Sequence, residues 1–97
     1  MDSNSAIGQF FLSIVLFDLN RLEEAEQSAR EALLRNPRLA LAYLTLADVD
    51  RRKHEFAMQL HDLDAYLKLA PDGPASKQVR QFREVLQRVV SKAKNHG

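Results

Sequence analysis

Apolar residues recur along this chain at the spacing of helices in five successive segments. The first segment, residues 6–17, is apolar at nearly every position and is followed by Asp18. We expect a helix there that is capped by Ser5, Asn4 or Ser3 and that ends at about Asp18. Because a helix with almost no polar side is normally buried on all sides, this segment should pack against other protein.

A second helix is predicted to begin after Asn20. Asn20 and Glu23 have the spacing of a capping-box relative, in which two side chains satisfy free backbone N–H groups. The helix should end near Arg35, because Pro37 disfavours helical geometry at the residue before it. Pro37 itself suits the first turn of a third helix. The apolar face of the second helix consists of Leu22, Ala25, Ala29, Ala32 and Leu33.

The third helix is expected to be the central one. Its segment, residues 39–49, is apolar almost all round, which is typical of a helix buried on several sides. The polar stretch 51–55 is short, so the helix after it should run antiparallel to the third. That fourth helix is predicted from Phe56, Leu60, Leu63, Leu67 and Ala70.

The sequence Pro-Asp-Gly-Pro at residues 71–74 predicts a turn before a fifth helix. Gly73 is expected to adopt a left-handed conformation there, and Pro74 is expected to open the helix. The apolar positions of this helix are Ala75, Val79, Phe82, Leu86, Val89 and Ala93.

Composition favours an all-α class. The chain has 97 residues, three glycines, three prolines and no cysteine. Only Gly8 and Pro37 of these helix-breaking residues fall within residues 5–70, so long helices are favoured over a many-turned β structure. Since there can be no disulfide framework and no thiolate site, packing must stabilise a single domain, residues 1–97.

The prolines indicate an internal repeat. Pro37 and Pro71 lie 34 residues apart, and two helices are predicted for each such period. This period, with proline in register, resembles the tetratricopeptide repeat (TPR) family over nearly the whole chain. Matching positions are Leu12, Leu16, Ala25, Ala29, Ala32, Tyr43, Leu46, Ala47, Leu63 and Tyr66, and polar departures are Gln9, Ser13, Asp50 and Gln59.

The resemblance implies antiparallel helix-turn-helix repeats stacked as a right-handed α-solenoid of five helices. Repeat 1 would span about residues 6–39, repeat 2 about 40–73, and a capping helix about 74–94. The outer positions of that last helix, Lys77, Arg80, Gln81 and Glu84, are polar, whereas the first helix is apolar where a preceding repeat would stand. We therefore expect the C-terminal portion of a longer, bacterial-type array, or a protein that covers this face by self-association.

The resemblance also implies a non-enzymatic protein–protein interaction module that binds a partner helix or peptide, or a second copy, through its concave face and first helix. The family's clamp of lysine, asparagine and arginine for a terminal carboxylate is absent, because the matching positions hold Phe10, Ile14, Thr45, Ala75 and Val79. The alternative is that several apolar groove residues pack against a missing repeat. The expected partner-binding residues are Ile7, Phe10, Phe11, Ile14, Val15, Phe17, Leu41, Leu44, Asp48, Arg51 and Arg52.

The distribution of charge along the chain suggests an alternative function. The net charge is +1, but residues 75–97 contain six basic residues and one acidic residue, so the last helix could bind nucleic acid or an acidic surface. The basic residues are Lys77, Arg80, Arg83, Arg88, Lys92 and Lys94. Nucleic acid is not the expected partner, because the interleaved aromatic residues of single-strand binders are lacking. A membrane is not expected either, since residues 6–17 fall short of the roughly 20 needed to span a bilayer and no basic region precedes them.

Candidate chemistry is sparse. His54, His61 and His96 do not form a set of convergent metal ligands, and the acidic pairs at 23/24 and 62/64 are explained as solvated helix faces. No phosphate-binding loop or nucleophile motif is present. The sequence therefore predicts no enzymatic activity, no cofactor and no metal. The lack of cysteine is compatible with the cytoplasm, which is slightly favoured, or the periplasm.

Overall fold

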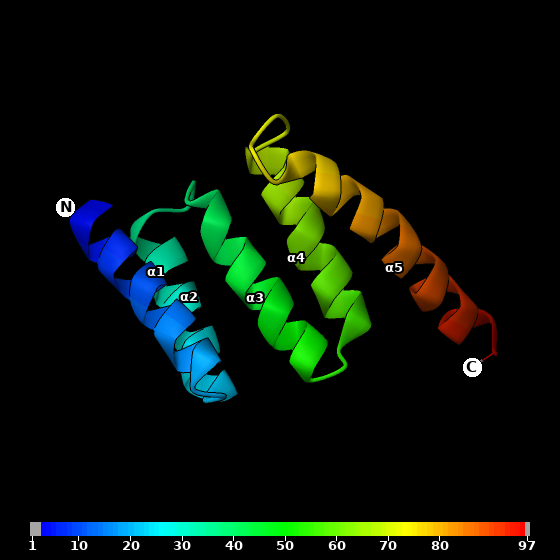
Figure 1. Cartoon of the computed structure of the whole chain (residues 1–97), viewed down its shortest axis with the longest axis horizontal. Helices are drawn as coiled ribbons and strands as arrows, with labels where there is room; N and C mark the ends of the chain where they lie inside the picture. Colours follow the sequence, from blue (N-terminus) through cyan, green and yellow to red (C-terminus); the bar gives the residue numbers. More distant parts are fainter. Residues whose placement is uncertain (1–2, 97) are drawn as a thin grey trace.

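The computed structural model describes residues 3–96, which form five α-helices and no strand (Figure 1). These are α1 (Ser3–Asp18), α2 (Leu22–Arg35), α3 (Ala40–Arg52), α4 (Phe56–Leu69) and α5 (Ser76–His96). The all-α class and the number of helices are thereby confirmed. The predicted ends of the first two helices, at Asp18 and Arg35, are also confirmed.

The helices run alternately up and down, so that each lies antiparallel to the next (Figure 1). α1 pairs with α2 and α3 pairs with α4, while α3 also contacts α1 and α2. α5 packs on α4 and extends away from the other helices toward the C-terminus. The result is an elongated molecule of 45 × 30 × 19 Å.

The turn between α1 and α2 differs from the predicted capping box. Asn20 does not cap α2; it has a φ of 61° and ends α1 in the left-handed conformation. The N–H of Asn20 bonds to the Phe17 carbonyl at 2.8 Å and the N–H of Arg21 to the Leu16 carbonyl at 2.9 Å, which is a Schellman motif. The prediction was wrong because asparagine tolerates the left-handed region and satisfied the carbonyls of the preceding helix instead.

The prediction of a cap at Ser5 was also wrong. α1 begins two residues earlier, at Ser3, and the Ser5 hydroxyl accepts a hydrogen bond of 2.8 Å from Nη1 of Arg35. The side chains of Ser3 and Asn4, the other proposed caps, lie outside the residues whose side chains the structure describes. Ser5 thus links α1 to the end of α2.

Pro37 lies before α3 and not in its first turn. The helix begins at Ala40, because the Asn36 side chain accepts a bond of 3.1 Å from the N–H of Arg38 and the Asn36 carbonyl accepts one of 3.1 Å from Leu39. These bonds form a separate turn that delays the helix. α3 therefore begins three residues after Pro37 and not at it.

The last turn differs in a similar way. α5 begins at Ser76 and not at Pro74, and Gly73 does not have a positive φ. Glycine is needed there for space, because a Cβ would lie 3.1 Å from the Tyr66 hydroxyl and 3.3 Å from Cβ of Ala70. The Ser76 hydroxyl donates to the Ala70 carbonyl and fixes the start of the helix.

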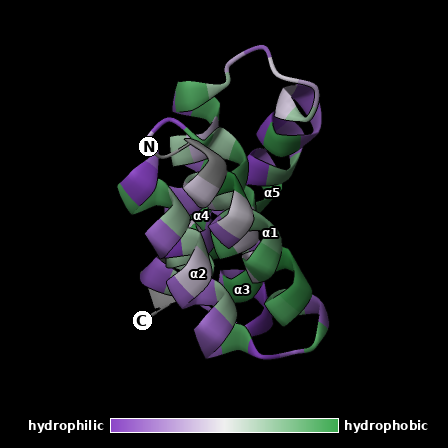
Figure 2. Ribbon diagram, turned by 90° about the vertical axis from the view of Figure 1, so that its left-hand side faces the viewer, coloured by the Kyte–Doolittle hydropathy of each residue, from purple (hydrophilic) through white to green (hydrophobic). Residues whose placement is uncertain are grey.

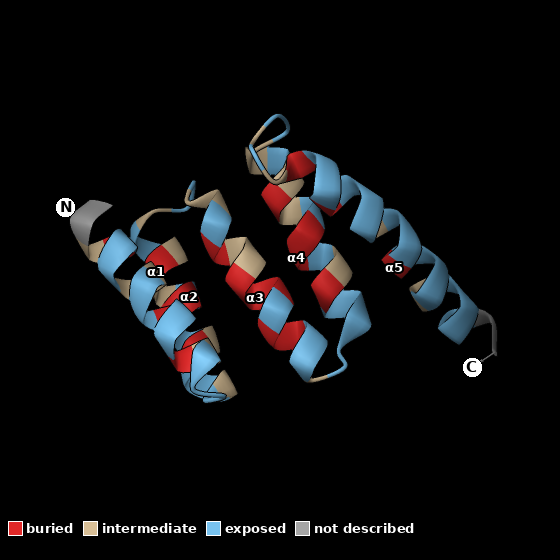
Figure 3. Cartoon of the chain, viewed as in Figure 1, coloured by how far each residue is buried: buried red, intermediate tan, exposed pale blue. Residues whose placement is uncertain are grey.

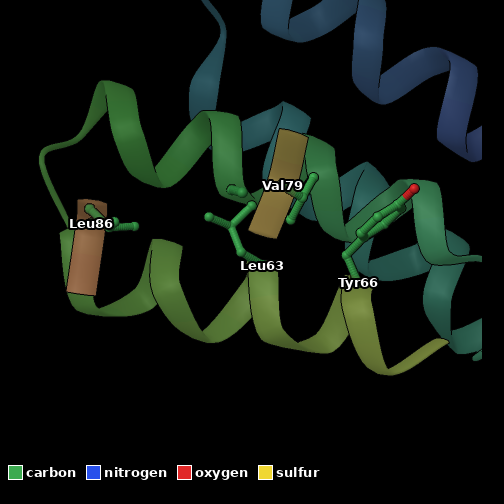
Figure 4. Packing of buried hydrophobic residues seen from close by; sticks show 5 residues of the cluster. Leu63, Tyr66, Val79 and Leu86 are labelled. Carbon is green, nitrogen blue, oxygen red and sulfur yellow. The ribbon is translucent and has the colours of Figure 1, made fainter. Parts of the chain in front are cut away.

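The buried residues lie where the helices face one another (Figure 3). α3 is buried on several sides, as predicted, and its buried positions include Ala42, Leu46 and Val49. Alanines 25, 29 and 32 let α2 approach its neighbours closely. The larger cluster joins α3, α4 and α5 and consists of Ala47, Leu63, Tyr66, Val79 and Leu86 (Figure 4).

Candidate partner-binding groove

A hollow of about 300 Å³ lies between α1 and α3. Its apolar side chains come from both helices, and Ile14 on α1 and Leu41 on α3 remain exposed. Its only charged lining residues are the acids Asp18 and Asp48. The lining residues are Phe10, Ile14, Phe17, Asp18, Leu41, Leu44, Thr45 and Asp48.

A second hollow, of about 280 Å³, lies between α3, α4 and α5. It shares Leu44 and Asp48 with the first hollow, so the two adjoin along one face of α3. We call the two hollows together the groove. The remaining residues of the second hollow are Ala47, Arg51, Gln59, Leu63, Gln78, Val79 and Phe82.

The structure brings most of the predicted groove residues together. Phe10, Ile14, Phe17, Leu41, Leu44 and Asp48 line the first hollow, and Arg51 lines the second. The predicted partner-binding set lacked eight residues that line the groove, although two of them, Thr45 and Val79, match clamp positions of the family. The eight are Asp18, Thr45, Ala47, Gln59, Leu63, Gln78, Val79 and Phe82. Phe82 and Val79 lie three residues apart on α5, and this spacing could have identified a groove-facing side of that helix.

Arg52 was predicted in the groove but lines neither hollow. Its guanidinium lies 4.5 Å from the centre of the Phe17 ring, and its Nη1 donates to the Asn20 side chain at 3.0 Å. A cation over an aromatic face is attracted to the ring. Arg52 therefore ties the end of α1 to α3 and supports the groove without lining it.

Ile7, Phe11 and Val15 are the other predicted residues that line neither hollow. All three are exposed on α1. Of the two leucines at matching positions of the first helix, Leu12 is exposed as well, whereas Leu16 is buried. Figure 2 views the molecule from this end and shows hydrophobic residues along α1 beside a largely hydrophilic α2. These exposed residues form a surface distinct from the groove.

Asp48 is a groove residue whose carboxyl has a shifted pKa and an ion-pair partner. Burial raises the pKa of its carboxyl, and the nearby guanidinium groups of Arg51 and Arg52 oppose that shift. Nη2 of Arg51 lies 3.6 Å from Oδ1 of Asp48. The centre of the groove thus contains an ion pair, whereas its α1 end is apolar with Asp18 at the margin.

Three of the six basic residues of α5 make polar contacts within the molecule. Arg83 forms a salt bridge with Asp64 of α4, which raises the pKa of Arg83, and Nη2 of Arg88 lies 3.8 Å from Glu84. Arg80 donates to the Pro71 carbonyl at 2.7 Å. Lys77, Lys92 and Lys94 are exposed on the same helix. The predicted basic surface is therefore partly neutralised.

Three polar side chains are buried close to one another, and this cluster was not predicted from the sequence. Asp50 on α3 and Asp62 on α4 are each 3% exposed, and Gln59 is 2% exposed. One oxygen of each, Oδ2 of Asp50, Oδ2 of Asp62 and Oε1 of Gln59, has no hydrogen-bond partner among the described residues. Unpaired buried polar atoms are costly, so burial disfavours the charged form of both carboxyls.

Burial raises the pKa of Asp50 to about 8, and the adjacent carboxyl of Asp62, within hydrogen-bonding reach, adds to the shift. Burial also raises the pKa of Asp62, against the attraction of Arg30 on α2. Protonation of one carboxyl lets it donate to the other and removes one unpaired atom. The pair therefore holds a proton at neutral pH, where three helices meet.

Lys53 and Glu26 hold α2 to the end of α3 beside this pair. The ammonium of Lys53 bonds to Glu23 at 2.7 Å and to Glu26 at 3.1 Å, and these bonds raise the pKa of Lys53. Partial burial would raise the pKa of Glu26, but hydrogen bonds from Lys53 and Arg30 hold it below its ordinary value. The contact is structural and leaves Glu26 charged.

The two histidines whose side chains the structure describes, His54 and His61, each lie beside a neighbouring side chain. Nδ1 of His61 lies 3.6 Å from Asp62, and the rings of His54 and Phe56 are 5.8 Å apart. Among residues 3–96 no group of three or more histidine, aspartate or glutamate residues is placed to hold a metal ion. None of the five described helices is long and apolar enough to cross a membrane.

Comparison with known proteins yields no match to a family model, to a curated protein or to a solved structure. The groove and the arrangement of the five helices are therefore the basis for the function proposed below.

Proposed function

We propose that this chain is a TPR-like helical-repeat module that binds a partner helix or extended peptide in the groove and has no enzymatic activity. The exposed apolar hollow between α1 and α3 is the observation that carries the proposal. Exposed apolar surfaces of this kind usually mark protein contacts. An amphipathic segment laid in such a groove would bury them.

The repeat assignment is supported by the turns. Asn20 and His54 are 34 residues apart and both have a positive φ, of 61° and 60°. Arg21 and Glu55, one residue later, both have φ −95° and ψ 75°. Each precedes a helix of 14 residues, α2 or α4. These matching turns support two equivalent repeats at about residues 6–39 and 40–73, and we propose that the repeats stack in a right-handed array.

The capping role of α5 is supported by its amphipathic character. Val79 and Leu86 are buried against α4, while Lys77, Arg80 and Glu84 are exposed. A polar outer face is what the end of a repeat array requires for solubility. The same arrangement places Phe82 in the groove, so α5 contributes to the proposed binding surface.

The charges of the groove suggest the chemistry of the bound segment. Two or three bulky apolar side chains would fill the first hollow, and a lysine or arginine beside them would face Asp18. Complementary charges at the margin of an interface fix orientation and accelerate association more than they raise affinity. We therefore propose an amphipathic segment with a basic margin.

Selection from a displayed library of short peptides tests this proposal. The selected peptides should share apolar residues at helical spacing with an adjacent basic residue. Their binding, measured by fluorescence anisotropy, should be lost in the double variant Ile14→Asp/Leu41→Asp, which places a charge on each wall of the first hollow. Leu34→Asp is the matched control, because Leu34 is 77% exposed on α2 and lies outside the groove. Equal binding by both variants would refute the groove as the binding site.

A further inference from the structure

A continuous apolar stripe runs along the side of α1 that does not face the groove. Its members follow the spacing i, i+3, i+4, i+7 and i+11, which places them on one helical face continuing into the turn. Exposed fractions are 60% for Phe11, 44% for Leu12, 53% for Val15 and 61% for Leu19. We call this surface the outer stripe; it consists of Gly8, Phe11, Leu12, Val15 and Leu19.

The area of the outer stripe fits a weak contact between two copies. Its exposed apolar side chains amount to roughly 400 Å² per chain, so two copies facing each other would remove about 800 Å², before the surrounding polar atoms are counted. That sum lies below the roughly 1,200 Å² at which stable interfaces begin, so the stripe supports a weak dimer that forms only at higher concentration. One margin of the stripe is polar, since the Glu31–Arg35 ion pair bonds to Ser5 of α1. An apolar centre with a polar rim is typical of protein interfaces.

Charge distinguishes a second copy from other occupants. No residue from Ser3 to Phe17 is charged, so the stripe offers nothing to orient a charged partner. The arginines on the adjacent helix are already paired, Arg30 with Glu26 and Arg35 with Glu31. Two identical uncharged stripes can meet without placing like charges opposite each other. A twofold contact requires such a self-complementary surface.

The positions of small and large side chains fit an antiparallel pair. If the twofold axis passes between Phe11 and Leu12, Phe11 faces Leu12 of the second copy and Gly8 faces its Val15. A Cβ at Gly8 would have nothing within 4 Å, so the space above it is open for that valine. Glycine at such a crossing lets two helix backbones approach closely.

We propose that a second copy of this chain docks on the outer stripe, with α1 antiparallel to α1 of its partner. The resulting dimer leaves both grooves open, because Phe10, Ile14 and Phe17 lie on a different side of α1 from the stripe. This inference is independent of the proposed function. Apolar contact of this size gives a dimer whose population depends on concentration in the micromolar range or above.

Molar mass measured by sedimentation equilibrium over a concentration series tests the dimer. The unchanged chain and the groove variant Ile14→Asp/Leu41→Asp should both dimerise. Phe11→Asp/Val15→Asp should remain monomeric with unchanged helical circular dichroism. A monomer at every concentration, or a dimer lost in the groove variant and retained in the stripe variant, would overturn the proposal.

Two further variants test the geometry without adding charge. Gly8→Leu fills the space above Gly8 and favours helix formation, so it should weaken the dimer at least tenfold without unfolding α1. Leu12→Cys lies beside the axis, and since the chain has no cysteine it should form an intermolecular disulfide under mild oxidation, whereas Leu34→Cys should not. Dimerisation of Gly8→Leu at unchanged affinity, or equal cross-linking of both cysteine variants, would refute the contact.

Discussion

Asn20 and His54 have the same left-handed backbone conformation, with φ of 61° and 60°, and they lie 34 residues apart. Each ends a helix in a Schellman motif: the N–H of Arg21 bonds to the Leu16 carbonyl at 2.9 Å, and the N–H of Glu55 to the Asp50 carbonyl at 2.8 Å. The chain therefore reverses direction in the same manner twice. The steric strain of this conformation is larger at His54, because histidine tolerates a positive φ less well than asparagine or glycine.

Replacing His54 by glycine should stabilise the protein. Glycine adopts a positive φ without steric strain, and we expect His54→Gly to raise the free energy of unfolding by about 0.5–1 kcal/mol. His54→Val, which is β-branched, should lower it by about 1–2 kcal/mol. Urea unfolding followed by circular dichroism measures both changes.

Asn20→Gly is the matched control for that prediction. It relieves less strain and also removes the side-chain oxygen that accepts a bond of 3.0 Å from Arg52. Its effect should therefore be smaller than that of His54→Gly, or destabilising. If His54→Gly destabilised the protein and Asn20→Gly did not, the conformation assigned to His54 would be wrong.

The buried pair of Asp50 and Asp62 predicts an unusual dependence of stability on pH. The pKa of Asp50 is raised to about 8 in the folded chain, against 3.8 as its ordinary value. Between these values the folded state keeps a proton that the unfolded state has released, so stability falls as pH rises. The contribution of Asp50 is complete below about pH 4 and is lost as the pH rises through 8.

Asp50→Asn should reduce this dependence, because asparagine has a similar shape and does not ionise, whereas Asp62 still does. We expect it to be more stable than the unchanged chain by about 1–3 kcal/mol at about pH 9, with a smaller difference at about pH 5. Thermal unfolding at several pH values measures the two curves. Glu26, Arg30 and Asp62 face the same site and remain in place, and Asp72→Asn, at an exposed acid, should keep the original slope. Parallel curves for Asp50→Asn and the unchanged chain would contradict the prediction.

Leu86 should contribute more to stability than its neighbours on α5. It is 5% exposed and belongs to the cluster with Leu63, Tyr66 and Val79. Leu86→Ala should cost about 2–4 kcal/mol and speed hydrogen exchange in α5 before α4. Val89→Ala, three residues away and exposed, should change stability by less than about 0.5 kcal/mol. Similar losses for both variants would mean that α5 does not pack on α4 through Leu86.

The helices were predictable from sequence because their apolar residues recur at a regular spacing, and the ends at Asp18 and Arg35 followed from local signals. The turns were harder, since Asn20 suits both an N-cap and a left-handed end of a helix. Only the competing bonds of the preceding carbonyls decide between them. The same ambiguity affected Gly73, where space near Tyr66 and not a positive φ requires glycine.

Most groove residues were predictable because Phe10, Ile14, Leu41 and Leu44 are apolar at positions that face one side of α1 and α3. The role of Arg52 was not, since its contact with the Phe17 ring depends on how the two helices cross. Nor was the Asp50–Asp62 pair, whose members lie on different helices. Contacts between distant residues require the tertiary arrangement, which the hydrophobic pattern does not specify.

The two glycines Gly8 and Gly73 should respond oppositely to replacement by alanine. A Cβ at Gly8 would meet nothing within 4 Å, so Gly8→Ala should stabilise α1 by about 0.5–1 kcal/mol through helix propensity. A Cβ at Gly73 would lie 3.1 Å from the Tyr66 hydroxyl and 3.3 Å from the Ser76 hydroxyl oxygen, so Gly73→Ala should destabilise by about 1 kcal/mol. Unfolding measured at a concentration where the chain is monomeric separates these effects from association. Because the Tyr66 hydroxyl oxygen is the nearest atom to that Cβ, Tyr66→Phe combined with Gly73→Ala should recover part of the loss. Stabilisation by Gly73→Ala on its own would show that the turn is open.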